Sequence, residues 1–212
     1  MGNMTYIVLQ SNIINWGETD NKEQLTEQIR DTLKSINSTI EEILISPLEF
    51  EDGIIEGVFK RGEGLYEIIL VLEFKLKPFK MQFGIGVCRN TRSSVPMAKA
   101  HIRAVDMLEQ VMNCEHRNKC AQTNIMLKSD DDDFDKIINS LLFLAFDIKN
   151  GWSRRQTEIL VNYFKSNENQ VKAADRMGIS QSSVQRSLRS AKYYLFKNTI
   201  NGIDKAFGYI TE

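Results

Sequence analysis

Residues 170–191 read QVKAADRMGISQSSVQRSLRSA, and this stretch decides the fold of the C-terminal part of the chain. Its apolar residues recur at helical spacing on both sides of Gly178, which predicts two helices joined by a tight turn. We expect the first helix over about 169–177 and the second from about 181, with Ser180 as its N-cap. The apolar positions are Ala173, Ala174, Met177, Ile179, Val184, Leu188 and Ala191.

The outer face of the second helix is polar and cationic. It carries Gln181, Ser182, Ser183, Gln185, Arg186 and Arg189. Such side chains read base edges and hold phosphates, so the pattern predicts a helix-turn-helix. It resembles the DNA-binding module of the sigma-factor region-four and response-regulator class. The alternative is a helical hairpin in a protein–protein module. Small buried residues, a turn glycine and a polar outer face together favour DNA binding.

The predicted DNA contacts fall into two groups. Gln181, Ser182, Gln185 and Arg186 are the expected base readers, and Ser180 and Ser183 lie beside them at the helix start. Five cations are the expected phosphate contacts: Arg154, Arg155, Lys172, Arg189 and Lys192. Because one module makes few contacts, we expect a homodimer that reads paired half-sites in double-stranded DNA.

The charge of the chain is divided unevenly between its two ends. Residues 151–212 hold ten Lys and Arg against five acids, a net charge of +5. Residues 1–150 therefore carry −6, because the 212-residue chain carries −1 in total. A basic segment on an acidic body is typical of a DNA-binding domain joined to a sensing or dimerising domain.

Composition also limits where the protein acts. No apolar run approaches the ~20 residues that a membrane span needs, and no signal peptide is apparent. The chain has three cysteines, without the spacing of a disulfide framework, which favours reduced thiols. We expect a cytoplasmic protein with no membrane partner.

The first 128 residues predict an α+β domain. Strands are expected over 5–10, 43–50, 53–59, 80–87 and 123–128, and helices over 22–36, 63–75 and 96–114. Asp52 and Gly53 suit the tight turn of a hairpin between the second and third strands. The order β-α-β-β-α-β, with a helix and a strand added, is that of a ferredoxin-like, palm-type fold.

The rest of the chain predicts helices only. Four consecutive acids, residues 130–133, suit the positive N-terminal end of a linker helix over 134–150 better than a metal site. A helix over 153–165 follows, with a capping box of Ser153 and Gln156. The second helix of the motif can continue to about Lys197, and a tail over 198–212 packs on the domain or binds a partner. We expect domains at 1–128 and 152–212, with 129–151 as linker.

The layout resembles the SatD family of small bacterial proteins, with a palm-related N-terminal domain and a C-terminal helix-turn-helix. Three segments carry the resemblance. They are LQSNIIN (9–15), SPLEFEDGIIEGV (46–58), and Arg154-Arg155-Gln156 leading into 169–188. With the strand FGIGV (83–87), it runs over most of the chain.

The palm resemblance implies metal-binding carboxylates at two positions that this chain fills otherwise. Asn12 stands at the first-strand Asp position and Gly53 at the hairpin Asp position, and neither holds a hard cation as a carboxylate does. We therefore expect no catalytic residue, metal or cofactor. A nucleotide or a partner protein remains a possible ligand of this domain. The alternative is a nucleotidyl cyclase or transferase coupled to DNA binding, with Glu51 and Asp52 as metal ligands.

Other motifs predict no further chemistry. The cluster Cys114, His116 and Cys120, with Cys88 upstream, lacks the two tight ligand pairs of a structural zinc site. His101 has no nucleophile near it in sequence. The glycine pairs at 62–64 and 84–86 lack the remaining residues of a phosphate-binding loop.

Overall fold

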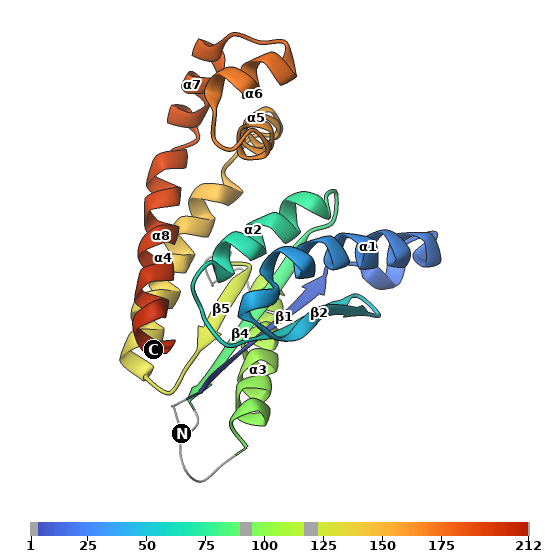
Figure 1. Ribbon diagram of the computed structural model, residues 1–212, viewed down its shortest axis with the longest axis vertical. Helices are drawn as coiled ribbons and strands as arrows, with labels where there is room; N and C mark the ends of the chain where they lie inside the picture. Colours follow the sequence, from blue (N-terminus) through green and yellow to red (C-terminus); the bar gives the residue numbers. More distant parts are fainter. Residues whose placement is uncertain (1–3, 90–94, 117–122, 212) are drawn as a thin grey trace. The chain divides into compact units, whose positions relative to one another are not determined.

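The structure is a computed structural model that describes residues 4–89, 95–116 and 123–211 (Figure 1). The chain forms two compact units, one of Met1–Phe143 with Ile203–Glu212 and the other of Leu144–Gly202. Helices α4 (Asp132–Asn150) and α8 (Tyr193–Thr211) each continue from one unit into the other. The unit boundaries thus fall inside two helices, whereas residues 128 and 152 were the expected domain limits.

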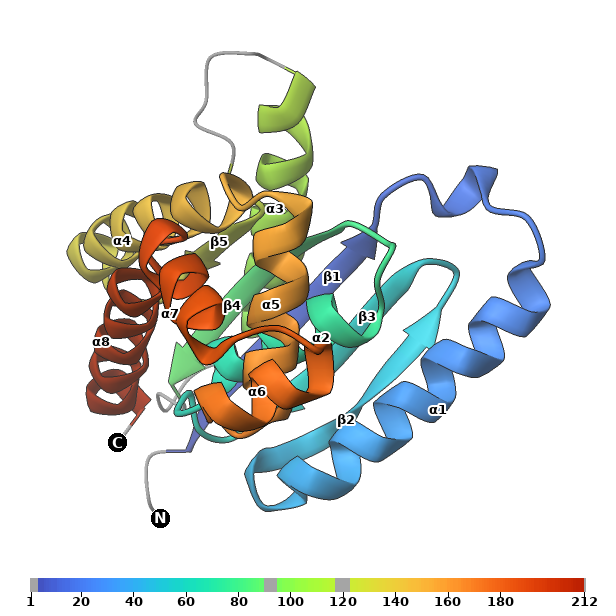
Figure 2. The same ribbon diagram turned by 90° about the horizontal axis from the view of Figure 1, so that it is seen from above.

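The first unit is α+β, with one mixed five-stranded sheet (Figures 1 and 2). Its strands stand in the order β2-β3-β1-β4-β5, and every neighbouring pair is antiparallel except β4 and β5. The elements are β1 (Thr5–Ile13), α1 (Lys22–Ile40), β2 (Leu44–Glu51), β3 (Ile54–Phe59), α2 (Leu65–Lys75), β4 (Met81–Arg89), α3 (Pro96–His116) and β5 (Ile125–Lys128). Each expected strand and helix of this unit is present, with ends that differ by a few residues.

The centre of the sheet is β1, which pairs with β3 on one side and with β4 on the other, and most of its residues are buried. Leu9 is opposite Gly57 on one side and Ile85 on the other. The hairpin between β2 and β3 turns at Asp52 and Gly53, with φ of 42° and 87°. Such left-handed values suit an Asp-Gly pair, so the predicted turn is confirmed.

Helix α3 packs directly on β4 at two glycines. A Cβ at Gly84 would lie 2.1 Å from the Ala104 carbonyl oxygen, and one at Gly86 would lie 1.9 Å from that of Ala100. Ala100 and Ala104 are fully buried. The glycine pair therefore lets a helix backbone approach a strand backbone closely, which the sequence did not indicate.

We expect Gly86→Ala to destabilise the sheet unit by about 1–3 kcal/mol, because a methyl group there has only backbone to displace. Urea unfolding followed by circular dichroism measures the change. Gly202→Ala is the matched control, since a Cβ at Gly202 has nothing within 4 Å and gains helix propensity. Equal stability of Gly86→Ala and wild type would contradict the close approach of α3.

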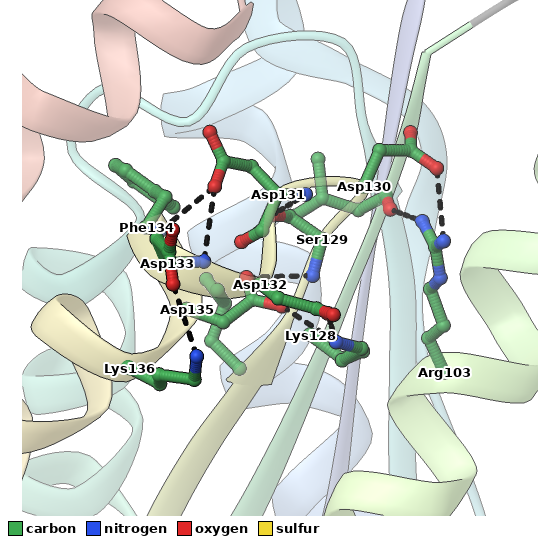
Figure 3. A network of polar contacts seen from close by, with 12 residues as sticks. Arg103, Lys128, Ser129, Asp130, Asp131, Asp132, Asp133, Phe134, Asp135 and Lys136 are labelled. Atoms are coloured by element: carbon green, nitrogen blue, oxygen red, sulfur yellow. Dashed lines mark hydrogen bonds and ion pairs between the residues drawn. The ribbon is translucent and has the colours of Figure 1, made fainter.

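The acidic run at 130–133 joins β5 to α4, and Figure 3 shows its contacts. Asp131 Oδ1 accepts from the backbone N–H groups of Asp133 and Phe134, at 3.1 and 3.0 Å, and so caps α4. The buried Asp135 accepts from the Ser129 N–H at 2.9 Å, and Lys128 Nζ lies 3.0 Å from its other oxygen. These acids act on a helix start, as the sequence predicts.

Asp130 links this junction to α3 and β4. Its carboxylate accepts from Arg103 at 2.8 Å, from Lys99 at 3.1 Å and from the Arg89 N–H at 3.1 Å. Burial alone raises the pKa of Asp130, but these three donors outweigh it and bring the pKa to about 2. Asp130 is thus an ionised tether between elements.

The second unit consists of the end of α4, α5 (Arg154–Lys165), α6 (Gln170–Met177), α7 (Gln181–Ser190) and the start of α8. Figure 2 shows α5, α6 and α7 in orange tones. In the described parts of the chain, no helix is long and apolar enough to cross a membrane.

The predicted continuation of the second motif helix to about Lys197 is wrong. Helix α7 ends at Ser190, and Lys192 has a φ of 51°, which an α-helix cannot contain. The chain restarts as α8 at Tyr193. Within the tail expected over 198–212, the described residues 198–211 form the rest of this helix, and Ile203 and Phe207 are fully buried.

Candidate nucleic-acid interface

Three short helices, α5, α6 and α7, enclose a small apolar core. Each helix contributes two or three buried residues to this core. They are Ile159, Leu160 and Tyr163 of α5, Ala173 and Ala174 of α6, and Val184 and Leu188 of α7. Met177 and Ile179 pack against this core while partly exposed. Because the alanines are small, α7 lies close to α6, and its apolar side is fixed inward.

Side-chain caps begin all three helices. Ser153 and Gln156 form the predicted capping box of α5, with bonds of 3.2 and 2.8 Å. Asn169 accepts from the N–H groups of Val171 and Lys172, both at 3.0 Å. Ser180 Oγ accepts from the Ser183 N–H at 3.2 Å, which confirms its predicted capping role.

The turn between α6 and α7 depends on Gly178. Its φ of 63° is left-handed, and its N–H bonds back to Asp175 O at 3.2 Å. The Ile179 N–H then reaches Ala174 O at 3.1 Å. This is how a helix commonly ends at glycine, as the sequence predicts.

The outer face of α7 is exposed along its whole length. Gln181, Ser182, Gln185, Arg186 and Arg189 are exposed, whereas Val184, Ser187 and Leu188 are buried. Helix α7 itself holds no acid. The predicted inner and outer positions are therefore confirmed.

All three predicted serines already have hydrogen-bond partners at the start of α7. The Ser180 hydroxyl lies 2.9 Å from those of both Ser182 and Ser183, and Ser183 is half-buried. Ser180 and Ser183 thus hold the helix start, while Ser182 remains exposed beside Gln181.

Arg154 and Arg155 lie in the first turn of α5 and share one acid. Arg154 Nε is 3.6 Å from Glu158 Oε1, and Arg155 Nη1 is 3.0 Å from Glu158 Oε2. The two side chains are 96% and 58% exposed. Such surface pairs contribute little, so both guanidinium groups can turn to a phosphate at small cost.

The start of α5 is held against the end of α7. Gln156 Nε2 donates to Ser190 Oγ at 3.1 Å, and Trp152 Nε1 donates to Ala191 O at 2.8 Å. This contact brings Arg154 and Arg155 to the same end of the unit as Arg189 and Lys192. Sequence reasoning missed both contacts, because their partners are more than thirty residues apart.

Of three further cations, two are exposed and one forms an ion pair. Lys172, in the first turn of α6, is exposed, and so is Arg176 in its last turn, which the sequence analysis did not select. Lys197, the expected end of the second motif helix, pairs with Glu168, which also accepts from the Tyr193 hydroxyl at 3.2 Å. Burial, with Glu168 nearby, raises the pKa of Tyr193, so its hydroxyl stays a donor.

Asn12 and Gly53, the two positions at which the palm resemblance implies carboxylates, lie close together in the sheet unit. Asn12 is opposite Ile54 at the end of the hairpin, and the Ile13 N–H donates to Gly53 O at 2.8 Å. The Asn12 amide donates to Gln82 Oε1 at 3.4 Å, a weak contact. Glu51 and Asp52 are exposed on the hairpin. The position opposite the hairpin therefore carries a neutral amide pair.

The cysteines and histidines considered as metal ligands or catalytic residues show no such arrangement among the described residues. Cys88 is buried, whereas the side chains of Cys114, His116 and Cys120 lie outside the described residues. His101 Nε2 is 2.9 Å from Glu56 Oε2, and Gln10 donates to the same oxygen at 2.9 Å.

The fold thus joins a mixed-sheet α+β unit to a small all-α unit. A model of the SatD family matches residues 6–203, so the chain belongs to the SatD family. No curated protein matches it. Among solved structures, a regulator of polyketide synthase expression from Bifidobacterium adolescentis aligns over 100% of this chain and 87% of its own, with 7% identity and a TM-score of 0.28. A likeness this weak supports no statement about fold or function.

We expect Ser180→Ala to destabilise the all-α unit by about 1 kcal/mol, because the Ser183 N–H loses its side-chain acceptor. Thermal unfolding measured by circular dichroism reports the loss. Gln185→Ala is the control, since Gln185 is exposed on the same helix and should leave stability unchanged. Equal midpoints for Ser180→Ala and Gln185→Ala would contradict the cap.

Proposed function

We propose that this protein is a sequence-specific DNA-binding transcriptional regulator, and that α5, α6 and α7 form a helix-turn-helix domain. The observation that carries the proposal is the acid-free outer face of α7, exposed from Gln181 to Arg189 while Val184 and Leu188 hold the opposite side in the core. A helix fixed in this way presents a constant set of donors to the major groove.

The charges around α7 support this function. Residues 144–202 hold ten Lys and Arg against four acids, so the unit is strongly basic. Arg154 and Arg155 come from α5, Lys172 from α6, Arg189 from α7, and Lys192 from the turn that follows α7. Cations on three elements around one helix suit two phosphate strands that border a groove.

Base reading falls to the exposed first two turns of α7. Gln181, Gln185 and Arg186 have the amide and guanidinium groups that bond adenine and guanine edges, and Ser182 adds a short donor. Ser180 and Ser183, which form the cap of the helix, position this face.

For the sheet unit we propose a ferredoxin-like, palm-type domain without catalysis. Support comes from the order β2-β3-β1-β4, all antiparallel, with helices after β1 and β3. The neutral Asn12–Gln82 pair at the palm position supports a role in dimerisation, or in binding a nucleotide or partner protein, over metal-dependent chemistry.

We expect Arg186→Ala to weaken binding to the preferred duplex by about 1–3 kcal/mol and to relax the sequence preference at one base pair. Lys192→Ala should weaken binding to all duplexes alike and make the dependence on salt less steep. Fluorescence anisotropy with the preferred duplex and a scrambled one, at two salt concentrations, separates the two effects.

Glu158→Gln is the matched control for these variants, because it removes the acid that Arg154 and Arg155 share. It should bind DNA at least as tightly as wild type. Unchanged affinity of Arg186→Ala for the preferred duplex would show that α7 does not read the bases.

We also propose that the protein binds DNA as a homodimer, with α4 as a contact between copies. Ile137, Leu141 and Leu144 are 61%, 36% and 57% exposed. Their spacing of four and three residues puts them on one side of the helix, the pattern by which two like helices pack together. Two copies would also supply the paired half-sites that a small reading domain needs.

We expect wild type to have a mass near twice 24.4 kDa in light scattering after size exclusion. Leu144→Lys should give a monomer, because a cation then interrupts the apolar stripe. Val171→Lys, at a residue 52% exposed on α6, is the control and should remain dimeric. A monomeric wild type would refute the dimer, and a dimeric Leu144→Lys would move the contact away from α4.

A further inference from the structure

The last turns of α8, residues 203–211, belong to the sheet unit and pack beside the start of α2. Phe207 is fully buried there, edge-on to Tyr66 at 5.9 Å between ring centroids and 6.4 Å from Phe134 of α4. Gly62 makes room for the ring, because a Cβ at that position would lie 1.8 Å from Phe207 Cδ1. This fitted contact anchors the end of α8.

Asp204 adds a polar contact one turn earlier on the helix. The Tyr66 backbone N–H, in the first turn of α2, donates to the Asp204 carboxyl. A helix start leaves such N–H groups without partners, and Gly64, the N-cap of α2, has no side chain to supply one. Asp204 therefore caps α2 from a segment far away in sequence.

The surroundings of Asp204 disfavour a negative charge. Its Oδ1 is shielded from solvent without a hydrogen-bond partner, and so is the hydroxyl of the fully buried Tyr66. The charged groups that act on it from the loop before α2 and from α2 itself are Glu63 and Glu67, both acidic. Its neighbour on α8, Lys205, is exposed. A neutral carboxyl fits this place better, since it can donate as well as accept.

The titration of Asp204 agrees with this geometry. Burial, together with the nearby Glu67 and Glu63, raises the pKa of Asp204 to about 7, despite the lowering effect of the Tyr66 N–H. The group is thus half protonated near neutral pH when α8 is docked, and ionised at that pH when the segment is free.

We propose that Asp204 makes the anchoring of α8 depend on protons: the neutral carboxyl holds residues 203–211 against the start of α2, and the ionised carboxyl loosens them. The docked segment binds a proton more tightly than the free one. Docking is therefore strongest below about pH 4 and weakens by about tenfold per pH unit until about pH 7, above which it stays constant.

Release of residues 203–211 would also affect the connection between the two units, because α8 runs from one unit into the other. Only two segments, in α4 and α8, join the two units covalently. When residues 203–211 are released, α4 alone still connects packed parts of both units. Protons would then set whether one helix or two tie the units together, independently of any DNA binding.

Hydrogen exchange in the full-length protein tests the proposal. We expect the protection of amides 203–211, corrected for the intrinsic pH dependence of exchange, to fall by more than tenfold between pH 5 and pH 7 in wild type. Asp204→Asn should show no such fall, because an amide accepts from the Tyr66 N–H and donates like the protonated acid. Glu67→Gln should keep more protection than wild type at pH 7.

Two outcomes would overturn the proposal. One is pH-independent protection of this segment in wild type, and the other is an equal fall in wild type and Asp204→Asn. If Asp204→Asn does not fold, carbon-detected NMR titration of the wild-type Asp204 carboxyl decides the matter. A midpoint near pH 7 supports the proposal, and one near pH 4 refutes it.

Discussion

The burial of Val184 and Leu188 against the small side chains of Ala173 and Ala174 is the interaction on which the proposed function depends. It fixes the rotation of α7 about its axis, so the polar and cationic residues must face outward. Larger residues on α6 would move the helices apart, and without Gly178 the chain could not turn between them. Specificity for a base sequence requires such a fixed face, because a rotating helix would offer a changing set of donors.

The sheet unit shows a similar dependence on small residues. Gly84 and Gly86 bring α3 onto β4, and Gly62 admits the ring of Phe207. Asp130 and Asp131, at the junction of β5 and α4, then hold the next elements by charge-assisted hydrogen bonds. None of these contacts involves Asn12, where the palm resemblance implies an Asp. The frame is therefore compatible with the role in binding or dimerisation that we propose.

The sequence predicted what depends on local periodicity and on residues close in the chain. The strands and helices of the sheet unit, the Asp52-Gly53 turn, the caps at Ser153 and Ser180, and the exposed face of α7 are of this kind. The predictions failed where the structure is determined by a single backbone angle or by a contact between residues far apart in sequence. The left-handed Lys192 separates α7 from α8, and Gln156 and Trp152 reach partners more than thirty residues away.

Some residues were conspicuous in the sequence, but their role depends on a contact that only the structure reveals. The glycines at 84 and 86 stood out, but the helix that they admit could be identified only in three dimensions. Asp204 gave no signal, because the start of α2 that it caps lies far from it in sequence.

Selection of the protein against a randomised DNA duplex over several rounds, at low and at physiological salt, is the decisive experiment on the DNA-reading role of α7. We expect enrichment of a two-fold symmetric site, and affinity that falls steeply as salt rises. Binding without enrichment of any sequence would contradict the reading role of α7, leaving only a basic surface. No binding at either salt concentration would contradict the account as a whole.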